Sequence, residues 1–405
     1  FSADGTSLVV SDNTTDSVYL YTLTTGYDLT KATYSGTNFS VASQDSVPGG
    51  MSFVNNGSKL LILGRANSLI YQYSTALSTA QLDLSTGSVF DYTPTSDVQV
   101  TLTNPAASGT SSGATLLLGS EDAAGVTGTF STTLYTGTGT SPNKITNNID
   151  LAGDGGLVWI KTRGTTADHC LGDTENGAGY YLQSNKNDGH GSQDFGNIVS
   201  FNSDGFTVGN YTRVNVVGPL VSWTFKKKTK FFDIVTYTGN GTARTISHNL
   251  GSVPSMILIK QTNTTRDWVV YHHSLGTAKH LRLNATTAAG PDSSGEYWGG
   301  TTPTSTQFSL GTYFAVNQNG GTYVAYLFAH DTDASSIIKC GSYTGTGATG
   351  NNVTLGWEPQ WLMIKNTTSG TRPWVMIDTK RGTTNSGSDQ YLKANSSDPE
   401  DVDSY

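Results

Sequence analysis

The sequence is poor in charged residues and in long apolar runs, and each shortage excludes a class of protein. Charged residues make up 13% of the 405 residues, against about 25% in an ordinary soluble protein. No apolar run approaches the roughly 18 residues of a membrane helix, so we expect no membrane insertion. The net charge of -8 argues against sequence-independent nucleic-acid binding, because such binding relies on lysine and arginine.

Cysteine is also scarce. The only two, Cys170 and Cys340, are too few and too far apart for a disulfide framework or a zinc site. We expect two free thiols, which leave the redox compartment open. One basic segment, residues 225–230, contains four lysines. A phosphate-binding patch is one reading of it, but we interpret it as a solvated linker between domains.

The residues that replace charge are Gly, Ser, Thr and Asn, with 47 glycines. Threonine and aromatic residues suit half-buried strands, and glycine and asparagine suit turns that need a positive φ. No long segment repeats apolar residues at helical spacing. We therefore predict an all-β fold of short strands separated by turns.

A repeat of about 52 residues occupies the N-terminus. Residues 1–8 recur as residues 53–60, and an Asp-Gly or Asn-Gly turn precedes a short apolar strand in each copy. An alternating strand follows each copy. This pattern predicts two propeller-blade-like hairpin repeats over residues 1–82. Two blades cannot close a propeller, so either further blades lie upstream or the hairpins pack differently. Residues 83–128 are interpreted as a linker with short strands, one of them over 114–118.

A second repeat fills the rest of the chain. Its opening motif, Tyr-Thr-Gly-x-Gly, begins at Tyr135, Tyr237 and Tyr343, which are 102 and 106 residues apart. A buried-looking strand that ends in lysine follows each motif, at Lys161, Lys260 and Lys365. The matched spacing of the opening motif and of the strand that ends in lysine predicts three β-sandwich repeats of jelly-roll type. We place repeat 1 at 129–228, repeat 2 at 229–330 and repeat 3 at 331–405.

Repeat 3 stops before the alternating aromatic strand that closes repeats 1 and 2, at residues 221–225 and 324–328. We therefore expect repeat 3 to be truncated, with one strand of its core missing. The sequence also begins in mid-pattern without a methionine, so we expect it to be a piece of a longer protein.

Two segments carry a family resemblance. FFDIVTYTGNGTARTISHNLGSVPSMILIK (231–260) and GGTYVAYLFAHD (320–331) resemble a repeated domain of large virion proteins from marine bacteriophages. The N-terminal FSADGTSLVVSDNTTDSVYLYTL is similar to propeller-like repeats in the same proteins. The resemblance covers most of the chain and implies a place in the virion, with contact to a host surface. It implies no catalytic residues.

Two glycine motifs match enzyme fingerprints, and both have simpler explanations. Residues 345–350 match GxGxxG, but this motif binds dinucleotides only between a strand and a helix. Here residues 352–355 read as a strand, and the glycines belong to the third copy of the repeated opening turn. Residues 109–113 match GxSxG, but they lie in the Ser/Gly-rich linker rather than in a strand-to-helix turn.

Candidate metal ligands are few. Asp168, His169 and Cys170 have no equivalents in the other repeats, and His272 and His273 should face opposite sides of a strand. We interpret both groups as loop or surface residues, and we predict no metal site and no cofactor. The loops 185–189 and 292–296 offer oxygen atoms for structural calcium, which stays an open alternative.

One aromatic pair reads as exposed. Tyr297 and Trp298 lie in a glycine-rich loop and are candidates for stacking on a sugar ring, whereas most of the other tryptophans occupy repeated strand positions and should be core residues. No pair of carboxylates is embedded among aromatic residues, as a glycan-cleaving site requires. Asp398, Glu400, Asp401 and Asp403 read as a solvated tail.

These features favour a structural protein without a catalytic centre. We expect a component of a phage virion, a tail fibre or similar appendage that adheres to host-surface glycans and contacts other virion proteins. Fibres often close strand edges between chains, so we also expect self-association into a homo-oligomer such as a trimer. The alternative is a secreted glycan-binding, or glycan-cleaving, β-sandwich protein.

Overall fold

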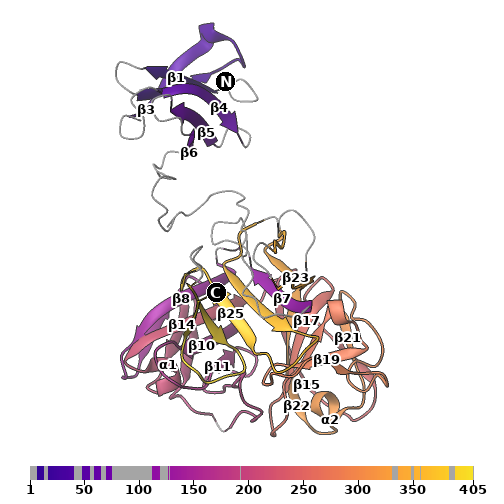
Figure 1. The fold of residues 1–405 in the computed structure, drawn as a ribbon. Helices are drawn as coiled ribbons and strands as arrows, with labels where there is room; N and C mark the ends of the chain where they lie inside the picture. Colours follow the sequence, from indigo (N-terminus) through magenta and orange to yellow (C-terminus); the bar gives the residue numbers. More distant parts are fainter. Residues whose placement is uncertain are drawn as a thin grey trace. The chain divides into compact units, whose positions relative to one another are not determined.

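The computed structural model describes residues 7–12, 17–40, 48–54, 59–64, 70–74, 112–118, 126, 128–191, 193–330, 336–347, 351–355, 357–382 and 388–404. The chain divides into two compact units, Phe1–Thr93 and Pro94–Tyr405. Antiparallel strands dominate both (Figure 1), which confirms the all-β prediction. Among the described residues, no helix is long and apolar enough to cross a membrane.

The first unit contains two three-stranded antiparallel sheets. Their buried side chains, among them Val18, Leu60 and Ile62, form one small core. The strand β5 begins 52 residues after β1, which matches the repeat in the sequence. The turns expected at 4–5 and 56–57 lie outside the described residues, and the propeller stays a prediction. The sheets are β1 (Ser7–Asp12), β2 (Ser17–Leu23) and β3 (Ala32–Ser40), with the short helix η1 (Leu29–Lys31), and β4 (Pro48–Val54), β5 (Lys59–Gly64) and β6 (Ile70–Ser74).

Repeats 1 and 2 share one sheet order in the second unit. The strand of the opening motif pairs with the closing aromatic strand. The closing strand also pairs with the strand that ends in lysine, and that strand pairs with the one that follows it in the sequence. In repeat 1 these are β8 (Phe130–Gly137), β14 (Gly218–Lys226), β10 (Gly156–Thr162) and β11 (Cys170–Asp173). In repeat 2 they are β15 (Phe232–Thr238), β22 (Thr322–Ala329), β17 (Pro254–Gln261) and β18 (Val269–His272), extended by β19 (Lys279–Arg282) and β20 (Gly290–Pro291).

A smaller second sheet covers each of these main sheets and makes the sandwich. The strand β10 is buried along its whole length because its two faces serve different cores. Leu157 and Trp159 point into a core shared among repeats, whereas Val158 and Ile160 point into the core of repeat 1 alone. The second sheets are β9 (Asn143–Thr146), β12 (Ile198–Asn202) and β13 (Gly205–Val208) in repeat 1, and β16 (Arg244–Ser247) and β21 (Gln307–Leu310) in repeat 2. Short helices accompany them: α1 (Thr212–Asn215), η2 (His273–Leu275) and α2 (Phe314–Asn317).

Repeat 3 obtains its closing strand from upstream of repeat 1. Its sheet runs β23 (Ile338–Thr344), β7 (Ser112–Leu118), β24 (Trp361–Asn366), β25 (Trp374–Asp378), β26 (Ser388–Lys393) and β27 (Asp401–Ser404). The strand β7 therefore lies between the opening strand and the lysine-ending strand, as β14 and β22 do. Figure 1 shows the purple β7 among the orange strands of repeat 3.

The register confirms that β7 is equivalent to β14 and β22. Each lysine that ends the buried strand faces a residue of the closing strand: Lys161 faces Val221, Lys260 faces Val324, and Lys365 faces Ala114. The expectation that repeat 3 lacks a core strand was therefore wrong. The strand predicted over 114–118 was confirmed, but its place in a linker was wrong, because its pairing partners lie more than 200 residues away in the sequence.

The three repeats share one aromatic core. Phe225 of β14 contacts Phe328 of β22, with ring centroids 5.5 Å apart, and Trp361 of β24, at 5.6 Å. Trp223 also contacts Trp361 at 6.4 Å. Because each repeat contacts the other two, we call this closed arrangement the ring. Such a core explains why the tryptophans occupy repeated strand positions.

Candidate functional site

The same pair of backbone hydrogen bonds joins the repeats at each of the three junctions of the ring. In each pair, one N–H of each repeat donates to a carbonyl of its neighbour, at matched positions. The bonds are His190 N to Thr262 O and Arg266 N to Asn187 O between repeats 1 and 2, Ala289 N to Thr367 O and Arg372 N to Thr286 O between repeats 2 and 3, and Glu400 N to Arg163 O and Ala167 N to Ser397 O between repeats 3 and 1. The ring therefore has internal threefold pseudosymmetry.

A side-chain nitrogen of tryptophan or histidine donates a further hydrogen bond across each junction, at equivalent positions of the repeats. Trp268 Nε1 donates to Gln183 O at 2.9 Å, and Trp374 Nε1 donates to Arg282 O at 2.9 Å. At the third junction the bond runs from His169 Nε2 to Lys393 O, at 3.1 Å. His169 therefore occupies the tryptophan position, and the expectation that it has no equivalent was wrong.

The tautomer of His169 follows from its second contact. Trp159 Nε1 lies 2.8 Å from His169 Nδ1, and an indole nitrogen can only donate. His169 Nδ1 must therefore accept, which leaves the proton on Nε2 for the junction bond. Burial, with Lys161 nearby, lowers the pKa of His169 to about 3. The neutral imidazole of His169 therefore links Trp159 to the carbonyl of Lys393. It is neither a metal ligand nor a surface residue.

The three lysines that end the buried strands hold backbone carbonyls, and one of them, Lys365, does so across a junction. All three side chains are fully buried, and burial lowers the pKa of each to about 8. Each Nζ donates to the carbonyl of the following residue. Lys365 Nζ also donates to Arg372 O at 2.9 Å and to Thr286 O of repeat 2 at 3.1 Å. These lysines hold backbone carbonyls, and they are not accessible to a ligand.

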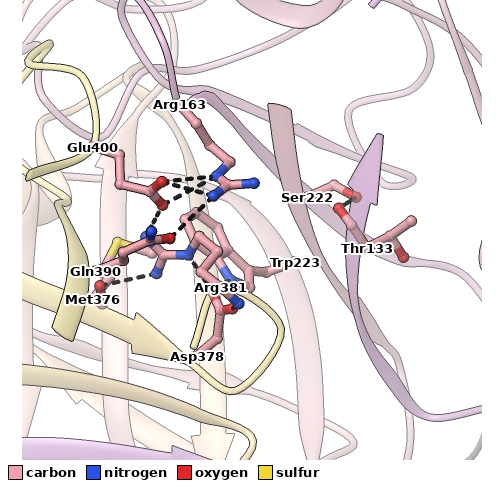
Figure 2. Close-up of polar contacts among 9 residues, drawn as sticks. All are labelled: Thr133, Arg163, Ser222, Trp223, Met376, Asp378, Arg381, Gln390 and Glu400. Atoms are coloured by element: carbon pink, nitrogen blue, oxygen red, sulfur yellow. Dashed lines mark hydrogen bonds and ion pairs between the residues drawn. The ribbon is translucent and has the colours of Figure 1, made fainter. Parts of the chain in front are cut away.

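The junction between repeats 3 and 1 contains a buried ionic cluster (Figure 2). Arg163 of repeat 1 donates to Glu400 from Nε and Nη2, at 3.0 and 2.8 Å. Arg381 Nε donates to Asp378 at 2.6 Å, and Arg381 Nη1 donates to Glu400 at 3.2 Å. Trp223 Nε1 donates to the same Asp378 carboxylate at 3.0 Å.

This ionic cluster overturns one interpretation. Glu400 was assigned to a solvated tail, but its side chain is only 11% exposed and it links two arginines. The side chains of Arg381 and Asp378 are fully buried. Every charge in the cluster has an opposite partner, which is the condition for keeping ions away from water. The cluster therefore acts as a clasp that closes the ring.

Beside the junction between repeats 1 and 2 lies a groove of about 210 Å³, lined by Asn187 of repeat 1 and nine residues of repeat 2. Arg266 and Arg282 lie beside aromatic side chains in this groove. The Arg266 guanidinium lies over the Phe314 ring, 4.7 Å from its centroid, and Phe314 is 46% exposed. We call it the Arg266 groove. Its lining residues are Asn187, Thr265, Arg266, Asp267, Val269, Arg282, Tyr297, Tyr313, Phe314 and Ala315.

Charge and hydrogen bonding give the Arg266 groove donors for a ligand. Arg282 Nε is paired with Asp267 at 3.2 Å, and Asn284 also donates to Asp267. Arg266 donates from Nη1 to Thr265 O at 2.9 Å, whereas its buried Nε has no hydrogen-bond partner among the described residues. Two arginines against one carboxylate leave the groove net positive. It suits a small polar or acidic group, since pockets for larger ligands span about 300–1,000 Å³.

Tyr297 and Trp298 are not exposed, and that expectation was wrong. They are 6% and 2% exposed. Trp298 Nε1 donates to Lys279 O at 2.9 Å, and Tyr297 stacks on His280 with ring centroids 3.9 Å apart. Burial raises the pKa of Tyr297. Only Tyr297 reaches a candidate site, as part of the wall of the Arg266 groove.

In each candidate calcium loop, one side chain uses its oxygen atoms within the fold. Asn185 Oδ1 accepts from His169 N, and the Asp292 carboxylate accepts from the amides of Tyr297 and Trp298. His273 Nε2 contacts Cys340 O at 3.0 Å. Within the described ranges, no three His, Cys, Asp or Glu side chains are grouped to hold a metal ion. Cys170 and Cys340 are both free and buried, as predicted.

The opening motif of the repeats is structural. Tyr135 and Tyr237 donate from their hydroxyls to Val214 O and Val316 O, at 2.6 and 2.7 Å. A Cβ at Gly137 would lie 1.9 Å from Val216 O, so only glycine fits there. In the third copy of the motif, which matches GxGxxG, Gly347 has a φ of +71°. Gly139 and Gly241 have similar positive φ angles in the other two copies. Residues 351–355 have no regular structure, so the strand predicted over 352–355 was wrong.

The two remaining sequence motifs do not form sites either. In the GxSxG match, Ser112 and Gly113 begin strand β7, and residues 109–111 lie outside the described residues. In the basic segment, Lys226 pairs with Asp154 at 2.6 Å and Lys227 pairs with Glu175. Lys226 and Lys227 are therefore held by carboxylates, and Lys228 donates to Thr129 Oγ1. The Arg266 groove was missed because its residues come from separate segments, and only the repeat alignment could have brought them together.

The comparisons with known proteins identify a family. Residues 126–405 match the model of a family described as a domain of unknown function, DUF7483. The chain belongs to this family. The matched DUF7483 residues contain all of the ring except β7, which ends at Leu118. Neither a curated protein nor a solved structure matches the chain.

Proposed function

We propose that this DUF7483 chain is a structural component of a phage virion, a tail fibre or similar appendage, and that it contacts the host surface. The observation that carries the proposal is the closed ring. Matched backbone bonds, the ring nitrogens of Trp268, Trp374 and His169, the Lys365 ammonium and the ion pairs of the clasp hold its repeats together. A rigid body of this kind suits a particle that must keep its shape outside the cell, and the resemblance of segments 231–260 and 320–331 points to the same class of protein.

The Arg266 groove supports the adhesive part of the proposal. Its arginines, amide and aromatic walls are groups that bind sugars, by hydrogen bonds and by ring contacts. The rest of the surface is rich in hydroxyl and amide groups, which also suit glycan contact. We therefore propose that the groove binds one unit of a host-surface glycan, with preference for an acidic sugar.

The virion assignment is tested by quantitative mass spectrometry of purified particles, together with immunogold labelling. We expect three or six copies per particle, at the tail. Hundreds of copies over the head would instead indicate a decoration protein. Absence of the chain from purified particles would contradict the proposal.

The adhesive assignment is tested with the labelled full-length chain and host cells. Arg266→Ala should reduce binding by at least about tenfold, which corresponds to about 1.4 kcal/mol. Arg372→Ala is the matched control, because Arg372 makes the equivalent backbone bond at another junction but does not line the groove. Equal binding by the two variants would contradict a role for the groove.

A glycan-cleaving enzyme is the rival function. It needs two carboxylates about 5–10 Å apart across a cleft. In the groove Asp267 is bound by Arg282 and Asn284, and the larger hollow beside it in repeat 2, about 400 Å³, is lined by one acid, Glu296. Incubation with host polysaccharide should release no reducing ends. Their appearance in proportion to enzyme concentration would favour the rival.

A further inference from the structure

One arginine of repeat 1 lies on tyrosine rings. The Arg213 guanidinium is 4.7 Å from the centroid of the Tyr181 ring and 5.9 Å from the centroid of the Tyr211 ring. Its Nη1 is buried and has no hydrogen-bond partner in the part of the chain that the structure describes. Asp194 accepts a hydrogen bond from Gly196 N at 2.9 Å, and its hydrogen bond to Tyr211 raises the pKa of that hydroxyl. The guanidinium therefore keeps N–H donors for an anion from outside the chain.

Matched backbone hydrogen bonds align this part of repeat 1 with the Arg266 groove of repeat 2. The matched pairs are Gly209 N to Asn197 O with Gly311 N to Tyr297 O, and Tyr211 N to Gly196 O with Tyr313 N to Glu296 O. Asn197 therefore occupies the position of Tyr297, and Arg213 occupies that of Ala315. Both Tyr297 and Ala315 line the groove. Repeat 1 thus has an amide and a cation at the place where repeat 2 has its groove.

The amide of Asn197 is the second polar group without a partner. Asn197 is fully buried, and neither its Oδ1 nor its Nδ2 has a hydrogen-bond partner among the described residues. In repeat 2 the equivalent Tyr297 lies against Tyr313, with ring centroids 4.3 Å apart. Asn197 should therefore lie beside Tyr211, the equivalent of Tyr313, and so near Arg213. Because buried amides are almost always hydrogen-bonded, this amide points to a partner that the chain does not supply.

Two exposed aromatic rings complete the group. Phe195 and Tyr211 are 51% and 40% exposed. A Cβ at Gly196 would lie 2.7 Å from the Tyr211 ring, so this ring packs on the backbone directly after Phe195. Among the described residues of the three repeats, the other large aromatic side chain exposed to this degree is Phe314 of the Arg266 groove. Exposed aromatic rings therefore gather at equivalent places in repeats 1 and 2.

We infer that repeat 1 has a second binding site for a sugar that carries a carboxylate. We call it the Arg213 cluster, and it consists of Tyr181, Phe195, Asn197, Tyr211 and Arg213. The guanidinium pairs with the carboxylate, and the exposed rings contact the C–H face of the sugar. The buried amide bonds a hydroxyl through a bridging water.

The Arg213 cluster rests on the proposed function, because it is a second site for the same class of ligand. Its consequence is for avidity. Two sites on one rigid body bind a repeating polysaccharide more tightly than either site alone, because the second contact is made within the same complex.

The test uses the full-length Arg266→Ala variant, in which the groove is disabled, with D-glucuronate as the probe. Isothermal titration calorimetry should show that this variant still binds glucuronate, and binds D-glucose more weakly. Adding Arg213→Gln should weaken glucuronate binding by at least about tenfold, because bonds from a charged donor are lost. Adding Arg244→Gln is the matched control and should change nothing, since Arg244 donates to Thr238 O outside the cluster. Tyr211→Ser, which removes an exposed ring, is a second variant and should also weaken binding.

Two results would overturn the inference. One is that Arg266→Ala abolishes glucuronate binding, which would leave the groove as the site. The other is that neither Arg213→Gln nor Tyr211→Ser weakens the binding that remains. Urea unfolding of each variant separates loss of binding from loss of the fold. If Arg266→Ala binds as tightly as the unsubstituted chain while Arg213→Gln does not, the role proposed for the groove fails and the Arg213 cluster stands.

Discussion

Two junctions of the ring have the same backbone bonds but different interiors. Beside the junction of repeats 1 and 2 lies the solvent-accessible Arg266 groove, mostly in repeat 2, and the junction of repeats 3 and 1 contains the buried clasp. Repeats 1 and 2 are covalently joined by the five residues between β14 and β15, whereas repeats 3 and 1 are joined by the eleven residues between β7 and β8. The link between repeats 3 and 1 is therefore about twice as long, and their junction also contains the fully buried Arg381–Asp378 pair.

The largest effect should come from breaking the clasp. Arg381→Met leaves the Asp378 carboxylate buried with no cation beside it, since the two side chains form the fully buried pair. We expect the free energy of unfolding to fall by about 3–5 kcal/mol. Urea unfolding of the full-length chain, followed by tryptophan fluorescence, measures this change. A loss below about 1 kcal/mol would mean that the clasp does not hold the ring closed.

The free energy of unfolding lost on replacing a buried lysine should depend on how many carbonyls the lysine donates to. Lys365→Met deprives three carbonyls of a donor, and we expect it to lower the free energy of unfolding by roughly 2–3 kcal/mol. Lys260→Met deprives one carbonyl and removes a desolvated charge, so its cost should stay within about 1 kcal/mol. The same urea experiment compares them. Equal costs would show that the extra bonds of Lys365 add no stability.

The neutral imidazole of His169 should make the clasp junction sensitive to acid. Burial lowers the pKa of His169 to about 3, against about 6.5 in the unfolded chain. Between these values the unfolded chain binds the proton and the folded chain does not, so the free energy of unfolding falls as the pH drops below about 6.5.

The matched variant is Trp159→Leu with His169→Trp, which gives repeat 1 the residues that repeat 2 has at these positions, Leu258 and Trp268. We expect it to reduce the loss of stability between pH 7 and pH 4.5 by roughly 1–3 kcal/mol, measured from urea unfolding at both pH values. An unchanged loss would assign the acid sensitivity to other groups.

The smallest effect should come from the groove. Arg282 and Asp267 are both 38% exposed, and a solvent-screened pair contributes about 0–1 kcal/mol. Arg282→Met should therefore change the free energy of unfolding by less than about 1 kcal/mol, and added salt should reduce the difference further. A cost equal to that of Arg381→Met would remove the distinction between the two junctions.

Local patterns predicted the elements of the fold well. Alternation and turn residues indicated strands, and the matched spacing of Tyr135, Tyr237 and Tyr343 placed the three repeats. The pairing of β7 could not be predicted this way, because its partners lie more than 200 residues away and its sequence lacks the aromatic residues of β14 and β22. Exposure was also misjudged at Trp298 and Glu400, since a glycine-rich loop or an acidic tail reads as surface until its packing partners are known.

The sequence by itself determined the all-β character, the spacing of the three repeats and the strand that ends in lysine in each repeat. These follow from interactions between near neighbours in the chain, which leave a periodic signal. Only the tertiary structure decided that the array closes into a ring, that β7 completes repeat 3, and that one junction contains an ionic clasp while a groove lies beside another. Each of these depends on contacts between distant segments, whose free energy is gained only after the chain has folded.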